Sequence, residues 1–493
     1  MHIHEFAVSA CQFFQICKED STFCFTFAEL KVNDIFMNHS RVHFIAIGGS
    51  AMHNLAIALH LKGYQVSGSD DEIFDPASSR LDSYGLLPPE FGWFPAKLDQ
   101  SIDSVILGMH ARSDNPELAK AKELGLKIYS YPEFLYEQSK DKLRVVIGGS
   151  HGKTTITAMI LHVLQQCNVD TDFMVGAKLD GFDVMVRLTE KAGVMVFEGD
   201  EYLTSALDPR PKFHLYKPDI ALVSGIAWDH MNVFPTFENY IEQFLIFMMM
   251  VPDSGALIYC DEDPEVQQVA AGIPGKMKKL PYGVPGHVVA GGKTVLKTAE
   301  GDVALKVFGR HNLMNMEGAR LVCNQLNISN ADFYKAISGF KGASNRLELI
   351  AEKQGFNAYR DFAHAPSKLK ATIQAVEEQF PSRKLFACFE LHTYSSLNKN
   401  FLNQYAGSMD KADVAVVYFS PHALGIKKLP MLSADDIKEG FARQGLLVFS
   451  ETGELQEFLR TQSWDNSNLL MMSSGNFDGI NVKEFANGLM NGE

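Results

Sequence analysis

The feature that most constrains the fold is a glycine-rich loop, "IGGSHGKTT", at Ile147–Thr155. The residues before it, "RVVIGG", are typical of a buried strand, and "KTTITAMILHVLQQC" has apolar residues at helical spacing. A glycine-rich turn between a strand and a helix presents backbone N–H groups, and the helix dipole adds partial positive charge. The loop therefore predicts a phosphate-binding site.

The loop departs from the usual Walker spelling at one position, because Ile147 stands where the first glycine is expected. This departure predicts a shorter loop than that of Ras-like GTPases. Lys153 would neutralise the β- and γ-phosphates of a nucleotide, and the Thr154 hydroxyl would ligate Mg²⁺. An ordinary glycine-rich turn between a strand and a helix is the alternative reading.

The segments around the loop alternate between strand and helix patterns. "VHFIAIGGSAMHNLAIALHLKGYQVSGSD" and "SVILGMHARSDNPELAKAKELGLKIYS" each read as strand, loop, helix and strand. Further buried strands are expected at "GVMVFEGDE", "PDIALVSGIAWDH", "LFACFEL", "VAVVYFS" and "NLLMMSS". Such alternation predicts an α/β fold with parallel sheets, whose ligands lie at the carboxyl ends of the strands.

At 493 residues the chain is long enough for about three domains of ~150 residues each. The polar stretch "EQSKDK" reads as a first linker and "FKGASNRLE" as a second hinge. We expect three domains, at 37–137, 138–340 and 341–493. Residues 1–36 are interpreted as an N-terminal extension that is possibly not native, because Met37 opens a segment that reads as a natural start.

Composition excludes several classes of protein. With 45 Lys and Arg against 59 Asp and Glu, the net charge of −14 argues against broad nucleic-acid binding. Seven cysteines without a C-x-x-C pair predict neither a zinc site nor a disulfide framework, as is usual in reducing cytosol. The apolar run "FLIFMMMV" is too short to span a bilayer. We expect a cytoplasmic protein without a membrane partner, and the sequence specifies no oligomeric state.

A second anion site is expected near the N-terminus, where "GGSAM" follows a strand and opens a helix. As a dinucleotide fingerprint the stretch is weak, because with Gly48 first the third and sixth places hold Ser50 and His53. Asp70, about 20 residues on, could take a ribose as in NAD enzymes. A nicotinamide-dependent oxidoreductase is therefore one alternative for this region.

An ordered set of motifs resembles one family. "GGSHGKTT" resembles the "GTHGKTT" loop of the Mur ligases, the ATP-dependent amide ligases of peptidoglycan synthesis, which commonly lack the first Walker glycine as well. "FEGDEY", "WDHMNVF", "FGRHNLMNMEGA", "NRLE" and "DFAHAPSK" resemble that family's EADE, D-H, G-x-H-N-x-x-N-x-x-A, R-x-E and D-x-A/G-H-H-P-T motifs. The resemblance runs from about Met37 to the C-terminus. It implies a Rossmann-like N-terminal UDP-sugar-binding domain at 37–137, a P-loop-type central ATP-binding (ATPase) domain at 138–340 and an α/β C-terminal ligase domain at 341–493.

The resemblance also implies a reaction and a set of site residues. A carboxylate attacks the γ-phosphate of ATP, and an amine then displaces the resulting acyl phosphate. ATP binding is assigned to Gly149, Ser150, His151, Gly152, Lys153, Thr154, Thr155, His311, Asn312, Asn315, Arg346 and Asp361. Mg²⁺ binding is assigned to Thr154, Glu198 and His230, and catalysis to Lys153, Glu198, His230, Arg346 and His364. UDP-N-acetylmuramate binding is assigned to Gly48, Gly49, Ser50, Ala51, Met52, Ser69, Asp70 and His110.

Each assignment has a plainer alternative. Glu198 and His230, each expected at the end of a buried strand, could be a solvated carboxylate and a core or capping histidine. The two asparagines of the "HNLMN" stretch also fit an ordinary helix start. Arg346 and Asp361 could form a surface ion pair. His110 and Asn115 could cap a helix.

The resemblance leaves the amine acceptor open between two members that use UDP-N-acetylmuramate. One adds L-alanine, and the other adds the recycled tripeptide L-alanyl-γ-D-glutamyl-meso-diaminopimelate. The D-x-R-x-K-F stretch in "EGDEYLTSALDPRPKFHLYKPD" and "DFAHAP" resemble the tripeptide-adding member. The chain departs from the family at Gly225, Ala227 and Ala365, and it lacks arginines after the "ELHTY" stretch. We predict a peptide acceptor, with L-alanine ligation or a non-catalytic UDP-sugar sensor as alternatives.

Overall fold

The computed structural model describes residues 40–491 except 110, 180, 206–207 and 229–232. The prediction of an extension at residues 1–36 lies outside the described residues. The chain divides into two compact units, of which the first runs to Gln138 and includes Val186–Glu190 and Leu203–Pro209. The second unit holds the remaining residues. Within the described residues, no helix is both long and apolar enough to cross a membrane.

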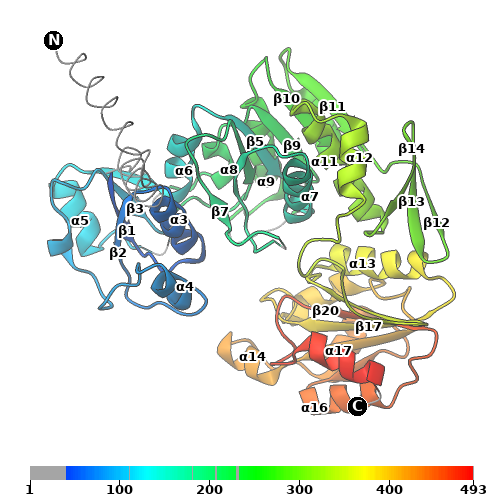
Figure 1. Cartoon of the computed structure of the whole chain (residues 1–493). Helices are drawn as coiled ribbons and strands as arrows, with labels where there is room; N and C mark the ends of the chain where they lie inside the picture. Colours follow the sequence, from blue (N-terminus) through cyan, green and yellow to red (C-terminus); the bar gives the residue numbers. More distant parts are fainter. Residues whose placement is uncertain (1–39, 110, 180, 206–207, 229–232, 492–493) are drawn as a thin grey trace, which may run out of the picture. The chain divides into compact units, whose positions relative to one another are not determined.

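The first unit is built on a four-stranded parallel sheet in the order β2-β1-β3-β4 (Figure 1). Its strands are β1 (Arg41–Ile45), β2 (Gln65–Ser69), β3 (Ser104–Leu107) and β4 (Lys127–Ser130). Its helices are α3 (Ser50–Leu61), α4 (Ala77–Ser83), η1 (Pro95–Lys97), α5 (Pro116–Glu123) and α6 (Tyr131–Ser139). Both predicted strand–helix–strand segments are confirmed. The linker predicted at "EQSKDK" is wrong in its first half, because those residues form the end of α6.

The second unit begins with a parallel sheet in which β5 is central, in the order β11-β10-β9-β5-β8-β6. Its strands are β5 (Leu143–Gly148), β6 (Thr171–Met174), β8 (Val194–Glu198), β9 (Ile220–Val223), β10 (Ala256–Cys260) and β11 (Lys278–Tyr282). Its helices are α7 (Lys153–Gln166), α8 (Lys212–Leu215), α9 (Phe237–Met249), α10 (Pro264–Gly272), α11 (Arg310–Gln325) and α12 (Asn330–Ile337).

Helices α7, α11 and α12 pack together (Figure 1), and their apolar faces form one buried cluster with β5, β8 and β9. The apolar run at "FLIFMMMV" belongs to α9, whose Phe244 and Phe247 are fully buried. This packing places the start of α7 and the start of α11 close to each other at the carboxyl ends of the strands.

A three-stranded antiparallel sheet follows, which the sequence did not predict. It consists of β12 (His287–Ala290), β13 (Lys293–Thr298) and β14 (Gly301–Leu305). Only every second residue of β13 is buried, so these strands lack the continuous apolar runs of the parallel sheet. The short strand β7 (Val186–Arg187) is counted with the first unit.

The C-terminal residues form a six-stranded sheet in the order β15-β16-β20-β17-β18-β19. Its strands are β15 (Glu348–Lys353), β16 (Phe356–Asp361), β17 (Lys384–Leu391), β18 (Val414–Phe419), β19 (Leu447–Phe449) and β20 (Ser467–Met472). All pair in parallel except β15 with β16. The accompanying helices are α13 (Pro366–Gln379), η2 (Lys399–Tyr405), α14 (Pro421–Ile426), α15 (Ala434–Phe441), α16 (Thr452–Arg460) and α17 (Val482–Asn491).

The predicted α/β fold is confirmed, and so are all five strands predicted beyond the first domain. The stretch predicted as a hinge, "FKGASNRLE", lies between α12 and β15 and forms no helix, with β15 starting only at its last residue. The C-terminal sheet is covered by apolar clusters on both faces, as parallel strands require.

Candidate active site

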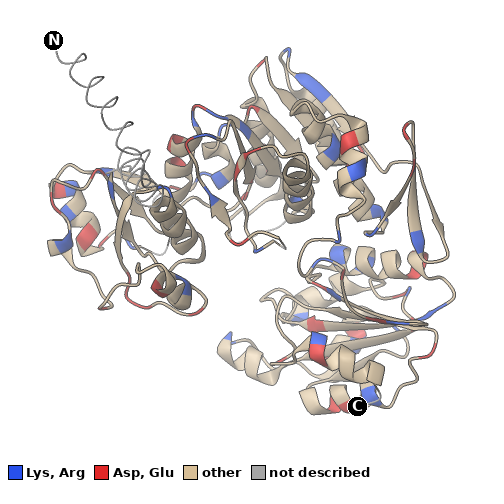
Figure 2. Cartoon of the chain, in the orientation of Figure 1, with Lys and Arg blue, Asp and Glu red and all other residues tan. Residues whose placement is uncertain are grey.

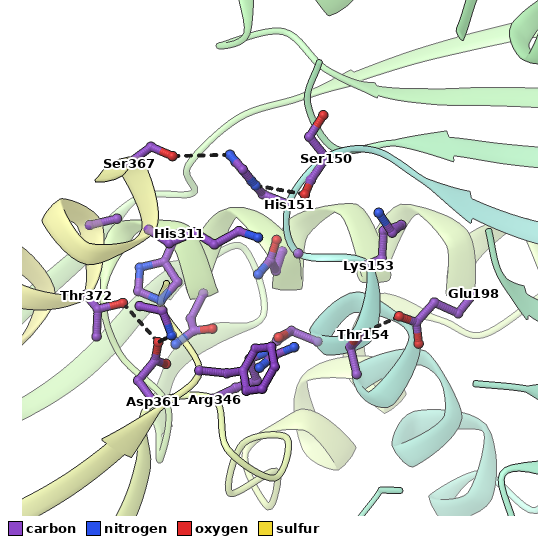
Figure 3. Close-up of a pocket in the computed structure, with 18 residues that line it drawn as sticks. Ser150, His151, Lys153, Thr154, Glu198, His311, Arg346, Asp361, Ser367 and Thr372 are labelled. Carbon is purple, nitrogen blue, oxygen red and sulfur yellow. Dashed lines mark hydrogen bonds between the residues drawn. The ribbon is translucent and has the colours of Figure 1, made fainter. Parts of the chain in front are cut away.

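A cavity of about 340 Å³ lies in the second unit, between the glycine-rich loop, the start of α11 and the C-terminal residues that follow β16 (Figure 3). It is lined by Ser150, His151, Gly152, Lys153, Thr154, Thr155, Glu198, His311, Asn312, Asn315, Arg346, Phe362, Asp361, Ala363, Ser367, Lys368, Ala371 and Thr372. The structure thus brings together every described residue predicted to bind ATP except Gly149, a residue of the same loop that does not line the cavity.

The loop geometry explains the unusual spelling of the motif. Ile147 is fully buried inside β5, where it pairs in register with Glu198 of β8, so the turn begins only after Gly148. Gly149 and Gly152 have φ of +127° and +80°, which favour glycine. A Cβ on Gly149 would lie 2.2 Å from the Ser224 hydroxyl. The prediction of a shorter loop is therefore consistent with the geometry.

Lys153, the first residue of α7, is held by the chain itself. Its Nζ donates to the Gly149 carbonyl and to the Glu201 carboxylate, each at 2.6 Å. Burial lowers the pKa of Lys153, but the carboxylates of Glu201, Asp200 and Glu198 outweigh that effect and raise it. The lysine is therefore charged at neutral pH and faces the space where phosphates would bind.

Thr154 and Glu198 form a pair of oxygen donors beside Lys153. The Thr154 hydroxyl donates to Glu198 Oε1 at 2.6 Å, and the Gly176 N–H donates to Oε2 at 2.9 Å. Hydroxyl and carboxylate oxygens are ligands that Mg²⁺ prefers. The two side chains fit an Mg²⁺ ion that also binds phosphate oxygens, and a solvated carboxylate is a poor description of Glu198.

His230, the third predicted metal ligand, lies outside the described residues. The strand predicted to run up to it is shorter than expected, because β9 ends at Val223 and residues 224–228 form no strand. The described residues that follow β9 contact the glycine-rich loop through their backbone. Ser150 donates its N–H to the Gly225 carbonyl, and Ala227 donates its N–H to Ser150 Oγ. These contacts need no particular side chain at Gly225 or Ala227.

His311, Asn312 and Asn315 come from the first turns of α11. Burial lowers the pKa of His311 to about 4, so its imidazole is neutral over the physiological range. Gly309 caps this helix without a side-chain hydrogen bond, and Asn312 Nδ2 donates to the Phe308 carbonyl. Asn315 Oδ1 would lie 2.3 Å from a Cβ on Gly152, so α11 packs directly against the loop. Neither asparagine is the N-cap of α11.

Arg346 and Asp361 both face the cavity from the C-terminal side. Asp361 is 7% exposed and accepts hydrogen bonds from the N–H groups of Leu347 and Ala363. Burial raises the pKa of Asp361. This effect outweighs the lowering of the pKa by Arg346 and by these hydrogen bonds. The Arg346 guanidinium lies 4.7 Å from the centre of the Phe362 ring. The reading as a surface ion pair is wrong, because Asp361 is buried.

His364, a predicted catalytic residue, does not line the cavity. Its Nδ1 bonds to the Phe362 carbonyl, and its own carbonyl accepts from the Tyr405 hydroxyl at 2.5 Å. The next residue, Ala365, is the N-cap of α13. Through these contacts, His364 stabilises the turn after β16.

Several lining residues were not among those predicted to bind ATP. Phe362, Ser367, Lys368, Ala371 and Thr372 lie after β16 and on the first turns of α13, and Ser367 Oγ lies 3.4 Å from His151 Nε2 (Figure 3). The signal for them is the position of α13 directly after the "DFAHAP" motif, since a helix there must present its N-terminal turns to the cavity.

The predicted UDP-sugar residues lie in the first unit, around the turn between β1 and α3. Gly48 and Gly49 form the turn, and Ser50, Ala51 and Met52 open α3. Gly48 donates its N–H to Asp70 Oδ2 at 2.7 Å. Burial raises the pKa of Asp70 to about 6. A Cβ on Gly48 would lie 2.9 Å from this carboxylate, so the turn needs glycine.

A lysine that the sequence did not indicate, Lys97, lies beside Ser69. Ser69 is fully buried, and Lys97 Nζ donates to its hydroxyl at 3.1 Å and to the Gly68 carbonyl. Asn115 is the N-cap of α5 and accepts from two backbone N–H groups, so the capping alternative holds for that residue. His110 lies outside the described residues.

Three family models match the chain in order. The model of the Mur ligase family catalytic domain matches residues 41–142, that of the Mur ligase middle domain residues 147–323, and that of the Mur ligase glutamate ligase domain residues 345–475. Together they span most of the chain.

Individual relatives have low sequence identity to this chain. The UDP-N-acetylmuramate–L-alanine ligase of Carboxydothermus hydrogenoformans is 28% identical, over 90% of this chain and 95% of that protein. The solved structure of UDP-N-acetylmuramate:L-alanyl-γ-D-glutamyl-meso-diaminopimelate ligase from Neisseria meningitidis is 26% identical, over 62% of this chain and 98% of that chain, with a TM-score of 0.55. The UDP-N-acetylmuramate–alanine ligase from Thermotoga maritima is 19% identical and shares the fold, with a TM-score of 0.67 over 92% of this chain and all of that chain.

We predict that Lys153→Ala abolishes ATP-dependent turnover while the chain stays folded, because the Lys153 charge faces the cavity rather than the core. The rate should fall more than about a hundredfold, which corresponds to ~2.7 kcal/mol of barrier. Phosphate release from ATP measures this, and exposed Lys276→Ala is the control. A Lys153→Ala variant that retains more than about a hundredth of the wild-type rate would contradict the assignment.

A second prediction concerns His311. Its folded-state pKa of about 4 lies below the ordinary 6.5, so between these values the unfolded chain binds a proton that the folded chain does not. Stability should therefore fall as the pH drops from 6.5 towards 4, by roughly 1–2 kcal/mol after allowance for partial exposure. Urea unfolding of wild type and His311→Gln across this range tests it: the two curves should diverge, and parallel curves would contradict the prediction.

Proposed function

This chain belongs to the Mur ligase family, and on that premise we propose that it joins the carboxylate of UDP-N-acetylmuramate to the amine of a peptide, L-alanyl-γ-D-glutamyl-meso-diaminopimelate. The chain is an ATP-dependent ligase that forms amide bonds, as the members of this family are. The first family model covers the region for which an oxidoreductase was considered, so that alternative is wrong.

The cavity around the glycine-rich loop supports ATP as the energy source. Lys153 and the loop N–H groups bind the phosphates, and Arg346 adds a second cation from the C-terminal side. Thr154 and Glu198, together with His230, would hold Mg²⁺, which neutralises charge on the phosphate oxygens. The His311 imidazole is neutral and, with Asn312 and Asn315, offers hydrogen-bonding groups to the adenine.

The chemistry then needs two steps. A carboxylate oxygen of the donor attacks the γ-phosphorus and ADP leaves, which gives an acyl phosphate. The acceptor amine attacks the acyl carbon, phosphate leaves and the amine loses a proton. The acyl phosphate is sensitive to water. This cavity is lined by the glycine-rich loop on one side and by C-terminal residues on the other, an arrangement that would limit the access of water.

The donor site is assigned to the first unit. The N–H groups of the turn at Gly48–Gly49 and the N-terminal end of α3 suit a diphosphate. Lys97 lies beside Ser69 and adds positive charge at the carboxyl end of β2. Asp70 is already engaged by the Gly48 N–H, so its carboxylate holds the turn in place for the uridine nucleotide.

The observation that carries the choice of acceptor is the composition of the loops at the carboxyl ends of the C-terminal strands. The loops after β16, β17, β18 and β20 (362–365, 392–398, 420–433 and 473–481) contain no arginine. A free amino acid has its carboxylate one carbon from the attacking amine, so its ligase needs a cation close to the acyl phosphate. In a tripeptide that near carboxylate has become a neutral amide.

The nearby cations are also committed elsewhere. Arg360 pairs with Glu348 at 2.8 Å, and Lys399 pairs with Asp436. Lys368 lines the ATP cavity. Lys427 and Lys428, at the end of α14, remain for carboxylates farther from the amine.

The D-x-R-x-K-F stretch adds a second argument. Lys212 Nζ donates to Asp200 Oδ2 at 2.5 Å and lies over the Tyr202 ring. The stretch that resembles the tripeptide-adding enzyme is thereby tied to the residues on either side of Glu201, the partner of Lys153. We infer that this segment belongs to the donor–acceptor side of the site.

L-alanine ligation is the second candidate, and one observation favours it. The curated relatives that are 28% identical over most of their length, from Carboxydothermus hydrogenoformans and Clostridium kluyveri, are UDP-N-acetylmuramate–L-alanine ligases. The two candidates share every step at the ATP cavity and differ only in the amine.

We predict that L-alanyl-γ-D-glutamyl peptides are good acceptors and that L-alanine is a poor one. A lost Arg–carboxylate contact is worth roughly 1.5–3 kcal/mol, so the preference in kcat/KM should exceed about tenfold. Phosphate release with UDP-N-acetylmuramate and each acceptor, measured side by side, tests this.

Three outcomes separate the alternatives. Equal or better turnover of L-alanine would favour the alanine-ligase candidate. Activity with neither amine, but with another peptide, would keep the ligase and change the acceptor. Binding of the UDP-sugar without phosphate release for any amine would instead indicate a sensor.

A further inference from the structure

A second cavity, of about 300 Å³, lies in the second unit where the β12–β14 sheet meets the hinge and the C-terminal sheet. One wall is the turn between β12 and β13 with the end of β14, and the opposite wall is β15, β16 and the end of α13. Phe308, Tyr359 and Phe380 form its aromatic floor, with ring centres 5.4–6.3 Å apart. Apart from Asn312 and Arg346, which also line the ATP cavity, no residue of this cavity has a role in the proposed reaction.

The cavity is strongly cationic in a chain of net charge −14. Its basic side chains are Lys293, Lys306, Lys341, Arg346 and Arg383, and its one acidic side chain is Glu352. Among the residues that the structure describes, no carboxylate forms an ion pair with Lys293, Lys306, Lys341 or Arg383. Figure 2 shows the Lys and Arg residues of the chain in blue and the Asp and Glu residues in red. A group of positive charges that no carboxylate neutralises attracts anions.

Arg383 is the most specifically positioned of these cations. Its Nη1 donates to the side-chain oxygens of Asn357 and Asn468, at 2.9 and 3.2 Å, and its guanidinium lies 4.6 Å from the centre of the Phe380 ring. Both acceptors are neutral amides, so they fix the orientation of the guanidinium without cancelling its charge. A planar, oriented guanidinium suits a phosphate.

The turn that carries Lys293 is held against α13. The Thr294 hydroxyl donates to Gln379 Oε1 at 2.8 Å, and Gln379 Nε2 donates to the Gly292 carbonyl at 2.7 Å. Thr294 and Gln379 are 1% and 4% exposed. These buried bonds fix the distance between the two walls, so the cavity is formed before any ligand arrives.

We propose that this cavity binds a small phosphate-bearing anion, separate from the ATP that drives ligation. Lys293 and Lys306 contact it from the β12–β14 side, and Arg383 contacts it from the C-terminal side. A cavity of this size admits a small molecule and not a nucleic-acid strand.

The position of the cavity links it to catalysis. Asn312 and Arg346 line both this cavity and the ATP cavity. An anion that draws the Arg346 guanidinium toward itself removes it from the ATP phosphates, so occupancy should weaken ATP binding. The site is thus a place where the level of a phosphorylated metabolite would modulate the ligase.

The test uses inorganic pyrophosphate as probe, and a Lys153→Ala background removes binding at the glycine-rich loop. In calorimetry at about 0.15 M salt, the Lys153→Ala protein should bind pyrophosphate with saturation. Adding Lys293→Glu and Lys306→Glu should weaken that binding at least about tenfold. The matched control adds Lys276→Glu and Lys438→Glu, which change net charge equally on exposed residues outside the cavity, and should bind like the background.

Each remaining outcome overturns the proposal. No binding by the Lys153→Ala protein means that the anion binds only at the ATP loop. Equal weakening by both pairs of substitutions means that net charge, and not this cavity, attracts it. Circular dichroism and melting temperature establish that all variants are folded, and neither result depends on which acceptor the ligase uses.

Discussion

The ion pair between Lys153 and Glu201 organises the whole site. Tyr240 donates to Glu201 Oε1 at 3.3 Å and lies 3.0 Å from Ser150 Oγ, which in turn accepts from the Ala227 N–H. This buried network ties the loop to the segment after β8, to α9 and to the segment after β9. The loop is therefore held in shape without a ligand, and incoming phosphates need only draw Lys153 away from one carboxylate. Preorganisation of this kind reduces the cost of binding and of phosphoryl transfer.

Much of this arrangement could be predicted from the sequence, because its signals are local. Buried parallel strands are continuous apolar runs, and the glycine-rich loop stands between a strand and a helix. Ile147 in place of glycine correctly indicated a loop that starts late, since that side chain belongs to the core of β5. Carboxyl ends of parallel strands meet at one edge, which is why Glu198 and the loop could be expected together.

What could not be predicted depends on contacts distant in sequence. The β12–β14 sheet is half exposed, so its strands lack a clear apolar pattern. The pairing of Lys153 with Glu201, rather than with Glu198, depends on where β8 ends. The motif around Asp361 predicts a nucleotide ligand. Its buried carboxylate instead accepts hydrogen bonds from the N–H groups of Leu347 and Ala363, which fix the hinge beside Arg346. No local pattern distinguishes these two uses of a carboxylate.

In the reaction that we propose, the site divides into a part that energises the donor and a part that selects the amine. The first is built from backbone N–H groups, Lys153 and oxygen ligands, and it is indifferent to the acceptor. The second lies in the loops after the C-terminal strands, where a change in a few side chains alters specificity without disturbing the sheet. This separation would allow a chain that is 28% identical to L-alanine ligases along most of its length to use the different amine that we propose.

Transfer of a carboxylate oxygen tests the account most directly. UDP-N-acetylmuramate with heavy oxygen in its carboxylate is incubated with ATP, the tripeptide and the enzyme, and the released phosphate is analysed by mass spectrometry. The account predicts that one labelled oxygen appears in each phosphate, because the carboxylate attacks the γ-phosphorus and its oxygen leaves with phosphate when the amine attacks the acyl carbon. Unlabelled phosphate would contradict it, since water rather than the donor carboxylate would then have attacked ATP.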